Sequence, residues 1–126
     1  MMKTVRFSFE KLEVWQEARE IIIPVYKLIG TFPATERYGL GDQLRRSVVS
    51  IASNIAEGSG RSSIKEKIHF IEISYGSLME VYCQLVLAVD LGYIKPESLT
   101  PIEPKIESIA KKLTGLRASF RKQLTA

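Results

Sequence analysis

The sequence predicts an all-α protein, an antiparallel up-down-up-down four-helix bundle that is oligomeric. Two observations support this fold class: four segments repeat apolar residues at three- and four-residue steps, and short turn-rich connections separate them. With 126 residues, of which 45% are hydrophobic and 25% charged, the chain fits one domain that buries its own core. This single domain, residues 1–126, is expected to contain helices at about residues 10–31, 41–57, 63–91 and 97–123.

The first expected helix carries an apolar stripe that a proline interrupts. Because Pro24 removes a backbone donor and clashes with the preceding turn, we expect a kink near residues 20–24. The segment TFPATERYG, residues 31–39, then ends this helix. Its stripe consists of Leu12, Trp15, Ala18, Ile22, Tyr26 and Ile29.

The second expected helix ends at a glycine. Gly58 supplies the permissive residue at its C-terminus, and the glycines of the following connection, EGSGRSS, are expected to allow positive φ. The stripe of this helix consists of Leu44, Val48, Ile51 and Ile55.

The third and fourth expected helices have clearer start signals. Ser63 with Glu66 three residues later is typical of a capping box. The fourth helix could begin at Pro96 or at Pro101, since proline suits the first helical position. The third stripe consists of Ile64, Ile68, Ile71, Tyr75, Leu78, Tyr82, Leu85 and Val89. The fourth consists of Leu99, Ile102, Ile106, Ile109, Leu113, Leu116 and Phe120.

Charged residues of the second helix require partners. Arg45 falls among apolar residues, where an unpaired buried charge would be costly. We expect Arg45 or Arg46 to pair with Glu72 or Glu80 of the third helix, within one subunit or between subunits. The residues assigned to structural ion pairs or assembly are Arg45, Arg46, Asn54, Glu57, Glu72 and Glu80.

The third helix has a second apolar side, which favours self-assembly. A helix of a small bundle should leave this side polar, so another copy of the chain is expected to cover it. The alternative is that this helix is simply central in the bundle, but bundles of this size rarely enclose one helix completely. The second apolar set is Phe70, Ile73, Val81, Leu87, Ala88 and Leu91.

Several longer motifs carry a family resemblance. The segments FEKLEVWQEARE, YGLGDQLRRS, SNIAEG and GSLMEV are similar to the small four-helix-bundle proteins encoded within intervening sequences of bacterial 23S ribosomal RNA genes. This resemblance implies an antiparallel bundle that forms a homopentamer and has no known enzymatic activity. The bundle type also resembles the accessory protein of diversity-generating retroelements, a basic pentamer that binds nucleic acid and a reverse transcriptase.

The positive charge is concentrated at the end of the chain. Residues 1–104 carry 12 Lys and Arg against 13 Asp and Glu, whereas residues 105–126 carry six against one. We therefore expect nonspecific binding of RNA or DNA through backbone electrostatics, with a scaffold for a partner protein, such as a reverse transcriptase, as the alternative. The start of the third helix offers a weaker anion site. The nucleic-acid candidates are Arg61, Lys65, Lys105, Lys111, Lys112, Arg117, Arg121 and Lys122.

The sequence does not favour an enzyme. Glu66 and His69 have the Glu-x-x-His spacing of di-iron bundles, but such sites need two copies of this motif, and His69 is the only histidine. A catalytic triad would also have to use His69, and nothing places Cys83 or a serine beside it. We expect no catalytic residue, no metal and no cofactor. The lone cysteine and the absence of a signal peptide or membrane span predict a cytoplasmic protein.

Overall fold

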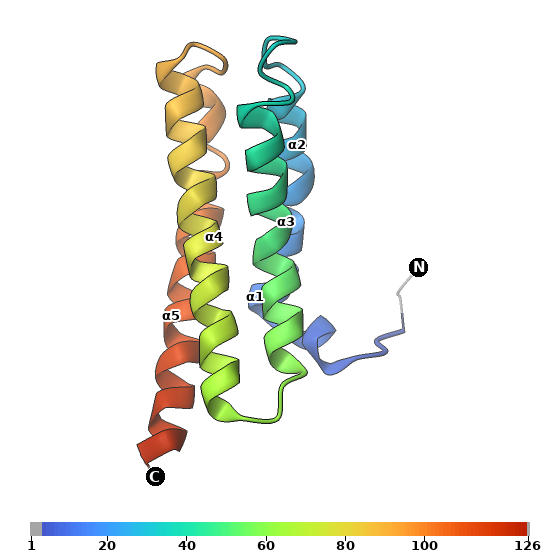
Figure 1. Cartoon of the computed structure of the whole chain (residues 1–126), viewed down its shortest axis with the longest axis vertical. Coiled ribbons are helices and arrows are strands. Elements are labelled where there is room, and N and C mark those ends of the chain that lie inside the picture. The colour runs from blue at the N-terminus through green and yellow to red at the C-terminus, as the bar shows by residue number, and fades with distance from the viewer. Residues whose placement is uncertain (1–3, 126) are drawn as a thin grey trace.

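The computed structural model describes residues 4–125, in which every regular element is helical. The elements are η1 (Ser8–Lys11), α1 (Glu13–Glu20), α2 (Ile22–Ile29), α3 (Leu40–Ser59), α4 (Ile64–Asp90), η2 (Pro96–Leu99) and α5 (Glu103–Thr125), where η denotes a 3₁₀ helix. Four rods make up the molecule in Figure 1, because α1 and α2 follow one another as a single broken rod. The α3 and α4 helices lie side by side, with the α1–α2 rod against α3 and with α5 against α4.

The first rod breaks at Ile21, a turn residue between α1 and α2. The break places Pro24 in the first turn of α2, where a backbone N–H has no partner within the helix. The kink expected near residues 20–24 is therefore confirmed. The predicted stripe is wrong at Tyr26, which is 42% exposed, because the buried residues of the rod follow the steps 14, 18, 21, 25 and 29 instead. The apolar residues buried outside that stripe are Val14, Ile21 and Val25.

The end of α3 differs from the prediction. Gly58 lies inside the helix, whose C-cap is Gly60 with φ −86°. The expectation of positive φ in this connection is therefore wrong, and within residues 4–125 only Gly92 has it, at 78°. Gly58 serves packing instead, since a Cβ there would lie 2.8 Å from Cβ of Phe70 on α4.

The caps of the last two helices follow recognisable signals. The Ser63 hydroxyl accepts a hydrogen bond from the N–H of Glu66 at 3.0 Å, so the predicted N-cap of α4 is confirmed. Gly92 ends α4, where the N–H of Tyr93 donates to the carbonyl of Ala88 at 2.8 Å. Both predicted starts of the last α-helix are wrong, because Pro96 opens only the short η2 and α5 begins at Glu103.

The core contains the stripes of α3, α4 and α5 largely as predicted. The α3 residues Leu44, Val48 and Ile51 are fully buried, as are Ile109 and Leu113 of α5. Each buried side chain of this size stabilises the fold by about 1.5–3 kcal/mol. The largest fully buried side chain is one that the sequence pattern missed, Phe32 in the α2–α3 connection.

Small polar side chains line the contact between α3 and α4. The Ser74 hydroxyl, which is fully buried, donates to the carbonyl of Ile51 at 2.8 Å. The hydroxyls of Ser50 and Ser77 lie 2.9 Å apart and share a hydrogen bond. The Ser47 hydroxyl donates to Glu80 in the same contact. We call Ser47, Ser50, Ser74, Ser77 and Glu80 the hydroxyl seam. Because each bond joins one position of α3 to one of α4, the seam fixes how the two helices are aligned along their length.

Candidate interaction surfaces

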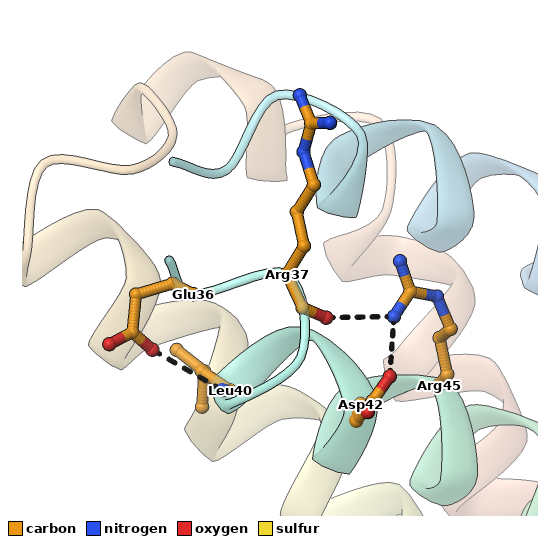
Figure 2. Close-up of polar contacts among 5 residues, drawn as sticks. All are labelled: Glu36, Arg37, Leu40, Asp42 and Arg45. Atoms are coloured by element: carbon orange, nitrogen blue, oxygen red, sulfur yellow. Dashed lines mark hydrogen bonds and ion pairs between the residues drawn. The ribbon is translucent and has the colours of Figure 1, made fainter. Parts of the chain in front are cut away.

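The α2–α3 connection is held by local polar contacts. Glu36 caps α3, since its Oε2 accepts a hydrogen bond from the N–H of Leu40 at 3.3 Å (Figure 2). Nη1 of Arg45 donates to Oδ1 of Asp42 at 2.7 Å and to the carbonyl of Arg37 at 2.9 Å. The Arg37 guanidinium in turn donates to the carbonyls of Gly30 and Phe32, just after α2. The motif YGLGDQLRRS therefore contributes to local structure.

The intramolecular ion pairs predicted between α3 and α4 are wrong. Arg45 is the cation of the local Asp42 pair, and its guanidinium also lies over the Tyr26 ring at 5.9 Å. Asp42 and the carbonyl of Arg37 already bind the Arg45 guanidinium, so it needs no partner on α4. This is why the predicted pair does not form. Arg46 is exposed and has no partner among residues 4–125, so pairing between subunits stays a prediction for this residue.

The two acidic candidates on α4 have other partners. Glu72 lies 3.8 Å from Arg117 and 3.2 Å from Arg121, so it joins α4 to α5. Glu80 accepts a hydrogen bond from Ser47 at 2.9 Å and is otherwise exposed. Asn54 of α3 bonds within its own helix, since its amide donates to the hydroxyl and the carbonyl of Ser50.

A shallow apolar groove follows α3 where it meets the first rod. It has an aromatic end at Phe9 and Trp15, whose rings meet edge to face at 4.9 Å between centroids. Its other end is basic, with Arg45 and Arg46 beside Tyr26. We call it the α3 groove; its lining residues include Phe9, Trp15, Ile22, Tyr26, Arg45, Arg46, Val49, Ala52, Ser53 and Ala56. The sequence pattern did not predict this groove; its signal was the set of apolar residues beside the stripe of the second expected helix, Val49, Ala52 and Ala56.

A second exposed surface follows the outer side of α4. Exposed apolar residues recur along it at helical spacing, with Glu80 between them. The predicted second apolar face is wrong at Val81 and Ala88, which are fully buried in the core because α4 contacts both α3 and α5. Phe70 is half-buried at the Gly58 contact. We call the outer surface the α4 stripe; it consists of Ile73, Gly76, Glu80, Cys83, Leu87 and Leu91.

The basic residues of α5 fall into two groups. Lys112 pairs with Glu13, at 3.3 Å, and with Glu17 of α1. Together with the Glu72 contacts of Arg117 and Arg121, this pair makes three of the six α5 cations part of the bundle. The other three, Lys105, Lys111 and Lys122, are exposed and have no acidic partner within residues 4–125.

The pairing with α1 changes two pKa values. Burial alone would raise the pKa of Glu17, but hydrogen bonds from Lys112 and Ser108, together with the Lys112 charge, lower it overall. The hydrogen bond to Glu17 is the main cause that raises the pKa of Lys112. Both shifts favour the charged pair, so Lys112 is engaged within its own chain.

The predicted anion site at the start of α4 also has acidic neighbours. Arg61 lies 3.3 Å from Glu57 and 4.0 Å from Glu66, and its guanidinium stacks 4.8 Å from the Phe70 ring centroid. These contacts occupy the arginine that was expected to hold phosphate. Lys65 is exposed and has no partner in the described part of the chain.

No metal centre or membrane helix is found among residues 4–125. His69 is exposed, with its ring 5.6 Å from that of Phe70. No cluster of three or more His, Cys, Asp or Glu side chains within that range has the arrangement to hold a metal ion. None of the helices there combines the length and the apolar character that crossing a bilayer requires.

The fold and surfaces define an all-α bundle protein with two unpaired surfaces and a partly neutralised basic helix. The family model for the 23S rRNA-intervening sequence protein matches residues 10–115, and the chain belongs to this family. The fold is also that of a protein of unknown function from the S23 ribosomal protein family of Bacteroides thetaiotaomicron, solved by crystallography. The two are 23% identical with a TM-score of 0.73, and the match covers 82% of this chain and 97% of that one. The comparison with curated proteins found no match.

Proposed function

We propose that this chain is a non-enzymatic, cytoplasmic subunit of a homo-oligomeric ring of up-down-up-down bundles. The α4 stripe of one copy packs into the α3 groove of the next. The observation that carries this proposal is the presence of two different apolar surfaces on one small chain, with Leu87 and Leu91 of the stripe 44% and 58% exposed. Exposed apolar surfaces of this kind often mark contacts between proteins.

The difference between the surfaces favours a ring over a two-fold dimer. A contact between unlike surfaces leaves one of each free, so copies add head to tail until the ring closes. Charge supports the same pairing, because within residues 4–125 Arg46 of the groove has no partner and Glu80 of the stripe bonds only to Ser47. The family resemblance implies five copies.

Matched substitutions test this assembly by light scattering. Leu87→Asp disables the stripe and Val49→Asp disables the groove, and each is expected to give monomers because a charge would be buried at the contact. Leu124→Asp changes an apolar residue of similar exposure, 45%, outside both surfaces and should leave the oligomer intact. An oligomer that survives both surface changes would contradict the proposal.

Mixing the two monomeric variants tests how the surfaces pair. Leu87→Asp keeps an intact groove and Val49→Asp keeps an intact stripe, so an equimolar mixture should form one-to-one dimers that grow no further. If like surfaces pair instead, each variant alone already forms dimers through its remaining intact surface, and mixing adds no new species. A mixture that stays monomeric would contradict pairing of the stripe with the groove. Circular dichroism of each variant alone establishes that it remains helical.

A second function, nonspecific binding of RNA or DNA, is supported by the unpaired cations of α5. Lys105, Lys111 and Lys122 form no ion pair within residues 4–125, and a ring would repeat them in every subunit. Such binding would act on the phosphate backbone and weaken steeply with salt. The other three cations of α5, Lys112, Arg117 and Arg121, form ion pairs with acidic residues of the same chain. They provide a control set of equal charge.

Two triple variants with equal charge change test the binding function. Replacing Lys105, Lys111 and Lys122 with Gln should remove most retention of a generic single-stranded RNA at low salt. The slope of log K against the logarithm of the salt concentration should become less steep by about 2, because each lost phosphate contact changes this slope by about 0.7. The same change at Lys112, Arg117 and Arg121 should have a smaller effect. Unchanged retention in the first variant would reject the basic surface and favour the protein-scaffold alternative.

A further inference from the structure

A cavity lies at one end of the bundle, where η1 meets α3, α4 and α5. It is lined by η1, the end of α3, the first half of α4 and the last half of α5, near the α3–α4 connection at the foot of the molecule in Figure 1. Its volume is about 220 Å³, and it is partly open to solvent. The apolar lining consists of Leu12, Ile55, Gly58, Ile71, Leu116 and Phe120. Neither the α3 groove nor the α4 stripe includes this space.

Among the described residues, Lys67 is the one cation that lines the cavity. Its Nζ donates to the carbonyl of Ser59 at 3.2 Å and lies 6.0 Å from the Phe120 ring centroid. An ammonium group has three N–H donors, so two are left for a ligand. No Asp or Glu is among the described residues that line the cavity, so its charge selects an anion over a cation.

The chemistry and size of the cavity define its ligand. An apolar cavity of about 150 Å³ holds a benzene molecule, so this cavity holds a ring or a short alkyl chain with a few further atoms. The Lys67 ammonium is suited to a carboxylate at one end of such a molecule, and Ser8 and Ser59 are the other polar residues of the lining. We propose that this cavity binds a small amphipathic carboxylate, with its apolar part between α3 and α5 and its carboxylate on Lys67.

Two probes of matched shape test the proposal. Binding of 3-phenylpropanoate and of 3-phenylpropan-1-ol to the full chain is followed by methyl NMR, which reports Ile55, Ile71 and Leu116 directly. Both probes should shift these methyl signals saturably, and the acid should bind about tenfold more tightly because its charged group accepts the stronger hydrogen bond. Shifts confined to the α3 groove, around Ile22 and Val49, would overturn the assignment.

A pair of lysine variants separates charge from shape. Lys67→Met keeps an apolar stem of similar length but removes the ammonium, so the preference for the acid should fall from about tenfold to none while the alcohol binds as before. Lys65→Met changes an exposed lysine outside the cavity and should keep the preference. If Lys67→Met keeps the preference for the acid, the proposal is wrong.

A third variant tests the space itself. Leu116→Phe adds volume to the lining and should abolish binding of both probes, since the added ring occupies the space of the ligand. Binding of both probes with unchanged affinity would contradict the assignment. Should this variant fail to fold, the two lysine variants still decide the question.

Discussion

The contact between α3 and α4 and the contacts of α5 are stabilised in different ways. The first is close and carries mostly neutral hydrogen bonds, with Ser74 fully buried and Gly58 directly against Phe70. The second combines an apolar stripe with ion pairs near the surface, such as Glu72 with Arg121. Both hold two helices together, and the first leaves no room for an added Cβ at Gly58.

This difference teaches where the fold is sensitive to substitution. Buried hydroxyls and glycines are tied to one alignment of the helices, because moving either helix leaves a buried polar group unpaired or creates a clash. Exposed ion pairs contribute less, since water and salt screen them and the long side chains lose entropy on pairing. We therefore expect changes in the α3–α4 contact to affect stability more than changes in the ion pairs of α5.

The largest effect is expected at Gly58. In Gly58→Ala the new Cβ would meet Cβ of Phe70 at 2.8 Å, and because that atom is next to the backbone, α3 and α4 must move apart. We expect the free energy of unfolding to fall by about 1–3 kcal/mol, measured by chemical denaturation at one protein concentration. The midpoint should fall while the slope of the transition stays constant.

A second glycine provides the control. Gly76 is also helical, on α4, but a Cβ added there meets no atom of residues 4–125 within 4 Å. Gly76→Ala should therefore raise the free energy of unfolding by about 0.5–1 kcal/mol, because alanine loses less entropy in a helix. It is best measured in the monomeric Leu87→Asp background, since Gly76 belongs to the α4 stripe. Equal effects of the two changes would show that the α3–α4 contact is not tight at Gly58.

The elements were largely predictable from the sequence because their signals are local. Apolar spacing located the helices, and Ser63 identified the start of α4. The glycine at position 58 was misinterpreted because the same residue type suits a helix end and a close helix contact. Only the position of Phe70 in space distinguishes the two, and the sequence of α3 alone does not contain it.

The candidate surfaces were less predictable because they depend on neighbouring helices. The charge count identified the basic end of the chain, but not that Glu13 and Glu17, about 95 residues away from Lys112 along the chain, neutralise part of it. The same limit applies to the α4 stripe. Val81 looked like part of an outer face until α3 and α5 were both placed against α4.

The smallest effect, and one that depends on pH, is expected at the ion pair between α1 and α5. The pKa of Glu17 is lowered from 4.5 in the folded chain, so its stabilising effect is present above about pH 4.5 and is lost as the pH falls through the lowered value. The pKa of Lys112 is raised from 10.5, so its effect is present below about pH 10.5 and is lost as the pH rises through the raised value.

Lys112→Met should therefore lower the free energy of unfolding most between these two limits. The loss should be smaller than that for Gly58→Ala and should shrink at either extreme of pH, where the wild-type pair is no longer fully charged. Lys111→Met is the matched control, since Lys111 is exposed and has no acidic partner within residues 4–125, and its effect should change little with pH. Parallel pH profiles for the two variants would mean that the pair with Glu17 contributes no pH-dependent stability, and Lys112 would then join Lys105, Lys111 and Lys122 as a cation free to bind phosphate.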